Sequence, residues 1–231
     1  MKNKINTAMI LAAGLGSRLM PVTARIPKAL IEVQGKPMLE RVIEYIIDAG
    51  IDNIVINIHY LPEQIADFIN ANQHRFPAAF HIIREPKLLG SGGSILNAME
   101  TIVKEPYLVV NCDVLLWGGN PLPLLTQMWD EARMDALLLV HDKDKLHKPK
   151  AGDMNVDANG NIVRNEPNLQ YIMTGCSVFA PAYFAGRKVE FFTTPEIFSH
   201  FSPRYFAIPN PYNWLDIGAQ EDLEYANWSC A

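Results

Sequence analysis

Short apolar runs alternate with longer amphipathic segments along the first 140 residues of the chain. The runs are almost continuously apolar, which predicts buried strands at 9–13, 29–33, 53–59, 80–84, 106–112 and 135–140. The amphipathic segments repeat apolar residues at helical spacing, which predicts helices at 37–49, 61–72, 91–103 and 121–133. Strands that alternate with helices indicate βαβ units. We therefore expect a three-layer α/β/α fold around a mostly parallel, mixed central sheet.

The pattern becomes less regular after residue 140. The segment 141–152 is polar and rich in lysine, which predicts a loop, and short runs on either side of a glycine predict a hairpin over 155–163. Further strands are expected at 174–179, 205–208 and 213–215, and further helices at 181–185, 195–201 and 219–228. We expect one domain over residues 1–231, with a Rossmann-like half at about 1–140 and a smaller closing half at about 141–231.

Composition narrows the class of protein. The formal net charge of −5 supplies no basic field, so nucleic acid is not an expected partner. No stretch approaches the roughly 20 apolar residues of a membrane span, and the N-terminal apolar run continues directly into a glycine loop instead of ending as a signal peptide does. Cys112, Cys176 and Cys230 form no CxxC pair, which argues against a zinc site and favours the reducing cytoplasm.

The first predicted strand ends in a loop suited to phosphate. Gly14 and Gly16 follow the strand directly, and Arg18 and Lys28 come soon after. Glycines let backbone N–H groups converge on one point and let a ligand approach without a Cβ atom in the way. Leu19 stands where a dinucleotide fingerprint has its third glycine, and no GKS or GKT follows. The loop predicts a triphosphate site, with a plain strand-to-helix turn as the alternative.

Two aspartates strengthen this hypothesis. Asp113 comes at the carboxyl end of a predicted strand, where ligands bind in open α/β sheets, although a helix N-cap is an equal reading. Asp216 lies between Leu215 and Ile217, and an acid among apolar neighbours needs a partner such as a metal ion. Mg²⁺ is held by one or two protein carboxylates together with phosphate oxygens. Both aspartates are therefore candidate Mg²⁺ ligands, provided that the fold brings them together.

The motifs together resemble one protein family. They are, in chain order, 11–18 (LAAGLGSR), 27–30 (PKAL), 89–94 (LGSGGS), 111–113 (NCD), 174–175 (TG) and 214–218 (WLDIG). This set, which extends over about residues 7–226, resembles the sugar-1-phosphate nucleotidylyltransferases, or NDP-sugar pyrophosphorylases. The short chain without a C-terminal β-helix is most similar to single-domain N-acetylmuramate 1-phosphate uridylyltransferases, with mannose- and heptose-1-phosphate guanylyltransferases nearly as similar.

The resemblance implies roles for the residues that match the family motifs. The nucleotide would be bound by Leu11, Ala12, Ala13, Gly14, Gly16 and Ser17 around the phosphates, and by Glu85 and Gly90 at the base. Arg18 would stabilise the departing pyrophosphate, and Lys28 would neutralise charge on the α-phosphate. Asp113 and Asp216 would hold the catalytic Mg²⁺. The half at about 1–140 would thus bind the nucleotide, and the half at about 141–231 the sugar.

The sugar-binding residues implied by the resemblance are Asn111, Glu166 and Gly175. Many members of the family carry a Glu-Lys-Pro segment whose lysine binds the sugar phosphate, whereas here the segment 165–168 reads Asn-Glu-Pro-Asn. Lys148 and Lys150, in the polar loop, are candidate replacements, and a solvated loop lysine is the alternative reading of each.

The implied reaction joins a nucleoside triphosphate and a sugar 1-phosphate to give an NDP-sugar and pyrophosphate, as in the synthesis of cell-wall or other polysaccharide precursors. UTP is favoured, with a hexose or hexosamine derivative such as N-acetylmuramate 1-phosphate, and GTP is the alternative, because a carboxylate at Glu85 can accept from uracil or guanine. Further alternatives are a choline-phosphate cytidylyltransferase, an NAD-binding protein and a non-catalytic nucleotide-sugar sensor. A sensor would be expected to lack Arg18, Asp113 or Asp216, and all three are present.

Overall fold

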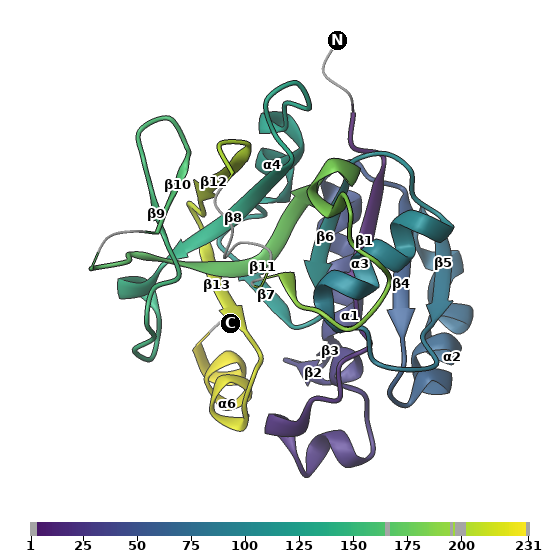
Figure 1. Cartoon of the computed structure of the whole chain (residues 1–231). Coiled ribbons are helices and arrows are strands. Elements are labelled where there is room, and N and C mark those ends of the chain that lie inside the picture. Colours follow the sequence, from purple (N-terminus) through teal and green to yellow (C-terminus); the bar gives the residue numbers. More distant parts are fainter. Residues whose placement is uncertain (1–3, 165–166, 195, 197–201, 230–231) are drawn as a thin grey trace.

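The computed structural model, shown in Figure 1, describes residues 4–164, 167–194, 196 and 202–229. Its centre is a seven-stranded sheet with the strand order β12-β8-β11-β6-β1-β4-β5. The strands are β1 (Thr7–Leu11), β4 (Asn53–Ile58), β5 (Ala79–Arg84), β6 (Tyr107–Asn111), β8 (Ala136–Asp142), β11 (Tyr171–Phe179) and β12 (Tyr205–Pro209). Within this sheet, β11 is antiparallel to both of its neighbours, and the other pairs are parallel. The predicted mostly parallel, mixed sheet is confirmed.

Helices cover both faces of this sheet. The residues of each strand alternate between the faces, so that Ile10 packs in one apolar cluster and its neighbour Met9 in another. The first cluster holds the apolar side chains of α1 (Met38–Asp48), α2 (Pro62–Asn72) and α4 (Leu122–Met128), and the second holds those of α3 (Gly90–Thr101). The predicted three-layer α/β/α arrangement is therefore confirmed.

A smaller group of elements lies beside the carboxyl ends of β1 and β6. The strand β7 (Val114–Trp117), which the sequence pattern did not predict, follows Asp113 and pairs antiparallel with β13 (Asn213–Asp216). The helix α6 (Gln220–Ser229) packs against both through a third apolar cluster. The remaining paired strands are β2 (Glu32–Val33) with β3 (Lys36–Pro37), and β9 (Asn155–Val156) with β10 (Ile162–Val163), the predicted hairpin.

Short 3₁₀ helices connect several of these elements. They are η1 (Ser17–Leu19), η2 (Val22–Ala24), η3 (Lys28–Leu30), η4 (Gln73–Arg75), η5 (Lys143–Lys145) and η6 (Pro181–Phe184). The predicted strand at 29–33 is confirmed only at 32–33, which form β2. Its first part is wrong, because the amides of Leu30 and Ile31 donate to the carbonyls of Pro27 and Lys28 and wind that segment into η3. The predicted helix at 181–185 is likewise the 3₁₀ helix η6.

Several predicted boundaries also move. The helix predicted over 121–133 ends at Met128, because Trp129 leaves the helical conformation and buries its indole, which is 1% exposed, in the core. The strand β8 extends into the predicted loop, and β11 begins three residues earlier than expected, since Tyr171 pairs with Asp142. Apart from Glu196, the predicted helix at 195–201 lies outside the described residues. No helix in the described part of the chain is long and apolar enough to cross a membrane.

Candidate active site

The glycine loop continues from the carboxyl end of β1. Gly16 has a φ of 64°, and a Cβ atom there would come within 2.7 Å of the Thr23 methyl group, while the Thr23 hydroxyl donates to the Gly16 carbonyl at 2.8 Å. Gly16 is thus required by the turn itself. A Cβ atom on Gly14, by contrast, would meet nothing within 4 Å. Gly14 therefore offers the open backbone that a ligand can approach, whereas Ser17 and Arg18, in η1, are exposed beyond it.

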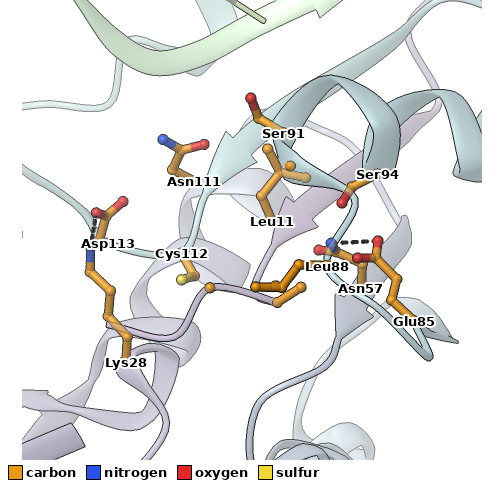
Figure 2. Close-up of a pocket in the computed structure, with 13 residues that line it drawn as sticks. Leu11, Lys28, Asn57, Glu85, Leu88, Ser91, Ser94, Asn111, Cys112 and Asp113 are labelled. Atoms are coloured by element: carbon orange, nitrogen blue, oxygen red, sulfur yellow. Dashed lines mark hydrogen bonds and ion pairs between the residues drawn. The ribbon is translucent and has the colours of Figure 1, made fainter. Parts of the chain in front are cut away.

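A cavity of about 220 Å³ lies between this loop, β6 and the start of α3 (Figure 2). Eight of the predicted site residues line it: Leu11, Ala13, Gly14, Lys28, Glu85, Gly90, Asn111 and Asp113. Asn57, Leu88, Ser91, Ser94 and Cys112 complete the lining. In Figure 2 the Lys28–Asp113 contact and the Asn57–Glu85 contact lie on opposite sides of the cavity, with Leu11 between them. The cavity thus has a charged end and a hydrogen-bonding end.

The hydrogen-bonding end is organised by Asn57 on β4. Its amide Nδ2 donates to Glu85 Oε1 at 2.9 Å, and its Oδ1 accepts from the Ala12 backbone N–H at 2.9 Å. Glu85 is only 4% exposed, and its second carboxylate oxygen is buried without a hydrogen-bond partner. A buried acceptor without a partner costs free energy, so this oxygen is suited to a ligand N–H. Asn57 was not among the predicted site residues, although a polar residue in an otherwise apolar strand was a signal for it.

The charged end is built around Lys28 and Asp113. Lys28 lies on η3, and its ammonium donates to Asp113 Oδ2 in a partly buried ion pair. Burial is the largest single influence on the pKa of Lys28 and lowers it, but the charge and the hydrogen bond of Asp113, with a contribution from Cys112, together raise that pKa above its ordinary value. The nearby Arg18 acts in the opposite direction and lowers the same pKa. Lys28 therefore stays charged at neutral pH.

The strand pair β7–β13 brings the second aspartate to the same place. Asp216 lies opposite Val114, and the Ile217 amide donates to the Asp113 carbonyl at 2.9 Å. A Cβ atom on Gly218 would lie 3.2 Å from an Arg18 guanidinium nitrogen and 3.4 Å from Asp216 Oδ2. Gly218 thus leaves room for the Arg18 guanidinium beside the second carboxylate.

The two aspartates fit a magnesium ion that is shared with a substrate. Their side chains are 14% and 25% exposed, so each can reach both solvent and ligand. No group of three or more His, Cys, Asp or Glu residues in the described ranges could form a cage made by the protein alone. Mg²⁺ is usually held by one or two carboxylates, with phosphate oxygens and water filling its other positions. The donor set at Asp113 and Asp216 is of that kind.

A second cavity, of about 230 Å³, adjoins the first and shares Leu11, Ser91 and Asn111 with it. Gly175 has a φ of 79°, and a Cβ atom there would lie 2.5 Å from the Asn111 amide nitrogen, so glycine is needed to seat Asn111 between the cavities. The rest of the lining comprises Ile95, Val109, Met173, Ser177, Phe179 and Thr194. Two of the three predicted sugar-binding residues therefore meet here, and the third, Glu166, lies outside the described residues.

The glycines at the start of α3 have a packing role. A Cβ atom on Gly92 would lie 2.2 Å from the Phe192 ring, and one on Gly93 would lie 2.0 Å from the Glu190 carbonyl oxygen. The amides of both glycines donate to the Phe192 carbonyl. These two glycines therefore allow the segment 190–192 to pack closely on the helix, and Ser91, which donates to or accepts from Thr194 at 3.2 Å, continues that contact.

The two candidate replacement lysines, Lys148 and Lys150, both form ion pairs, and their side chains are 30% and 33% exposed, so neither is a lysine that contacts solvent alone. Lys148 pairs with Asp222, a buried residue whose Oδ2 accepts from the amides of Gly218 and Ala219. Lys150 donates to Asp216 Oδ1 at 2.7 Å. The loop therefore delivers Lys150 to one of the two candidate metal ligands, which the sequence analysis did not foresee.

Comparison with known proteins agrees with this geometry. The family model described as Nucleotidyl transferase matches residues 7–230, so the chain belongs to the nucleotidyl transferase family. A protein of Caulobacter vibrioides named N-acetylmuramate alpha-1-phosphate uridylyltransferase is 31% identical over 159 residues, which are 66% of this chain and 65% of that protein. A protein of Oryza sativa subsp. japonica named probable mannose-1-phosphate guanylyltransferase 1 is 25% identical over 235 residues, which are 93% of this chain and 62% of that protein.

The chain thus spans less than two thirds of the length of these two relatives. Among solved structures, that of HddC from Yersinia pseudotuberculosis complexed with GMP-PN is similar, with a TM-score of 0.79 and 24% identity over 96% of this chain and 98% of that one. This likeness shows that the two chains share their fold.

Proposed function

We propose that the protein transfers a nucleoside monophosphate from a nucleoside triphosphate to a sugar 1-phosphate, giving an NDP-sugar and pyrophosphate. The observation that carries this proposal is the meeting of the open glycine loop, Arg18 and Lys28 with Asp113 and Asp216 at one edge of the sheet. Two phosphate-bearing substrates and a divalent cation are what such a set of charges accommodates. The product would be a precursor of a cell wall or another polysaccharide, made in the cytoplasm.

The reaction requires no activated side chain as nucleophile. A phosphate monoester has its second pKa near 6, so a sugar 1-phosphate is mostly a dianion at pH 7. One of its oxygens forms the new bond to the α-phosphorus, and the bond from that phosphorus to the β-phosphate oxygen breaks. Cys112 lines the cavity, but burial raises the pKa of its thiol to about 12, so the thiol stays protonated and unreactive. The protein's task is alignment and charge neutralisation.

The chain's own residues meet that task with fixed positive groups. The open backbone at Gly14 takes the triphosphate, Arg18 holds the pyrophosphate end, and Lys28, at the Asp113 end of the cavity, neutralises the α-phosphate. Asp113 and Asp216 would hold Mg²⁺, which would supply further positive charge against the phosphates. Preorganised charges of this kind are usually the largest source of catalysis when charge develops in the transition state.

The base is assigned to the opposite end of the first cavity. The unpartnered Glu85 oxygen accepts an N–H from the base, and Asn57 fixes the carboxylate through its other oxygen. Uracil offers its N3–H and guanine its N1–H and N2 amino group. We favour UTP, because the relative with 31% identity is named as a uridylyltransferase, and we keep GTP as the second candidate, because the plant relative is named as a guanylyltransferase.

The sugar is assigned to the second cavity. Asn111 and the hydroxyls of Ser91, Ser177 and Thr194 suit sugar hydroxyl groups, while the apolar part of the lining suits the C–H face of the ring and an acyl substituent. This favours a hexose or hexosamine derivative such as N-acetylmuramate 1-phosphate. Because the two cavities share Asn111, a phosphate between them would face both substrates.

The test is pyrophosphate release in the presence of Mg²⁺, with four nucleoside triphosphates crossed against a panel of sugar 1-phosphates and choline phosphate. We expect release with UTP or GTP and one class of sugar 1-phosphate, and no release from a triphosphate alone. Release with CTP and choline phosphate would contradict the sugar assignment. No release with any pair, from protein that binds nucleotides, would favour the sensor, and tight binding of NAD(H) instead would favour a dinucleotide site.

A further inference from the structure

The loop between β8 and β9 places a lysine on one of the candidate metal ligands. Lys150 Nζ lies 2.7 Å from Asp216 Oδ1 and 5.7 Å from the centre of the Trp214 ring. The side chain is 33% exposed, so solvent and ligands can reach it. Lysine is a compact charge on a flexible stem. The ammonium can therefore change partners without movement of the backbone.

The loop itself is anchored close to this lysine. The His147 ring stacks on Tyr225 of α6, with the ring centres 4.3 Å apart and the planes at 18°. His147 Nε2 also lies 3.2 Å from Asp222 Oδ1, and Lys148 pairs with the same carboxylate. These contacts hold the loop on α6 two residues before Lys150. The position of Lys150 beside Asp216 is thus a property of the fold.

The charges of the site show what a metal ion does to this contact. Arg18, Lys28 and Lys150 surround two carboxylates, Asp113 and Asp216, so this end of the substrate-free site already has more cations than anions. A divalent cation on Asp216 competes with the Lys150 ammonium for the same carboxylate. Two cations on one carboxylate repel each other, so the ammonium is then free to move to water or to another anion.

The surroundings of Lys150 indicate which anion that is. The Trp214 indole beneath it donates to the Thr174 carbonyl at 3.0 Å, and Thr174 precedes Gly175, which seats Asn111 at the junction of the two cavities. Arg18 and Lys28 come instead from the segments next to the glycine loop. Lys150 lines neither cavity itself, but Trp214 and Thr174 connect it to Gly175 in the lining of the second one.

We propose that Lys150 binds the phosphate of the sugar 1-phosphate, and that a metal ion on Asp216 releases it for this purpose. The inference rests on the proposed function, since it assigns a residue to the second substrate of that reaction. In the free protein, Asp216 thus binds the Lys150 ammonium close to the position proposed for the sugar phosphate. Binding of the metal and of the second substrate is then coupled through one side chain.

The test compares Lys150→Ala with Lys150→Arg and with Lys145→Ala, a matched control because Lys145 is an exposed lysine of the same loop. Loss of a charge-assisted hydrogen bond predicts a rise of about tenfold or more in the KM for the sugar 1-phosphate in Lys150→Ala, with the KM for the triphosphate within twofold of wild type. We expect Lys150→Arg to recover part of the loss and Lys145→Ala to match wild type.

A second readout needs no substrate. Mn²⁺ binding to the free protein, followed by the EPR signal of unbound Mn²⁺, reports the competition at Asp216 directly. We expect Lys150→Ala to bind Mn²⁺ several-fold more tightly than wild type, because the competing ammonium is gone, and both other variants to bind it as wild type does. If Lys150 merely supported the loop, its replacement would not tighten metal binding while weakening the binding of the sugar phosphate.

The outcomes separate this inference from the proposed function. An active wild type whose Lys150→Ala variant keeps the sugar-phosphate KM, or raises the KM for the triphosphate alone, overturns the role of Lys150. Mn²⁺ binding that is unchanged or weaker in that variant overturns the exchange at Asp216. A wild type without activity on any substrate pair overturns the proposed function instead, and the Mn²⁺ measurement still decides whether Lys150 and a metal ion compete.

Discussion

The replacement Glu85→Gln tests how the site reads the base. Glu85 is 4% exposed, and one of its oxygens accepts from Asn57 while the other has no partner in the free protein. Glutamine keeps the shape, but its amide oxygen will face Asn57, so an NH₂ group points at the place of the base N–H. The glutamine NH₂ group and the base N–H are both donors, so they repel each other at the place where the base N–H donated to the carboxylate.

The size of the effect follows from the bond that is lost. A hydrogen bond to a charged group contributes about 1.5–3 kcal/mol, and 1.4 kcal/mol corresponds to a factor of ten. We therefore expect kcat/KM for the preferred triphosphate to fall roughly 10- to 150-fold. The same change removes a buried carboxylate oxygen without a partner, so the free energy of unfolding is expected to stay level or rise.

Steady-state kinetics with the triphosphate varied, together with a thermal melt, measures both effects. The matched control is Glu63→Gln, since Glu63 pairs with Arg84 on the surface and should change neither quantity. A kcat/KM for the triphosphate that remains within twofold of wild type would refute the assignment of Glu85 to the base. A loss of activity that comes with a lower melting temperature would instead make Glu85 a structural residue.

Three further predictions follow from the same contacts. Gly14→Ala should keep the wild-type melting temperature yet raise the KM for the triphosphate at least tenfold. Gly93→Ala, whose Cβ would lie 2.0 Å from a backbone oxygen, should instead lose roughly 1–3 kcal/mol of unfolding free energy in a urea titration. Equal melting temperatures of the two variants would contradict this difference. Asp113→Asn and Asp216→Asn should each lower Mg²⁺-dependent turnover about a hundredfold or more with the fold intact by circular dichroism, and near-normal turnover would remove that residue from the metal site. Burial lowers the pKa of His141, so as the pH falls this imidazole is protonated in the unfolded chain before it is protonated in the folded one. The unfolding free energy should therefore fall as the pH drops below about 6.5, and His141→Gln should flatten that dependence on pH.

The alternation of apolar runs and amphipathic segments was enough to predict the sheet and its covering helices. This worked because the inner strands of a mostly parallel sheet, such as β4 and β6, are buried on both faces and therefore read as continuous apolar runs. It failed at β7, where the run Val114–Trp117 is short and is followed by glycines, so nothing local distinguishes a strand from a connection. The pairing with β13, about a hundred residues away, is what makes it a strand.

The candidate site was predicted in part for a related reason. The glycine loop, Lys28 and Asp113 belong to segments that lie next to a strand end, and sequence position alone indicates that such segments meet at one edge of the sheet. Asn57 was missed because its role depends on Glu85 and Ala12, which lie on other strands and loops. The Lys150 contact was missed because a loop lysine gains its partner only from the docking of that loop on α6.

The measurement that tests the central claim most directly is the fate of an isotope label. A sugar 1-phosphate carrying ¹⁸O in its three non-bridging phosphate oxygens is incubated with the preferred triphosphate and Mg²⁺, and the NDP-sugar is read by ³¹P NMR. Attack of the sugar phosphate on the α-phosphorus predicts that the oxygen between the two phosphates of the product carries ¹⁸O. An unlabelled bridging oxygen would show that the bond forms elsewhere and would contradict the mechanism assigned to this site.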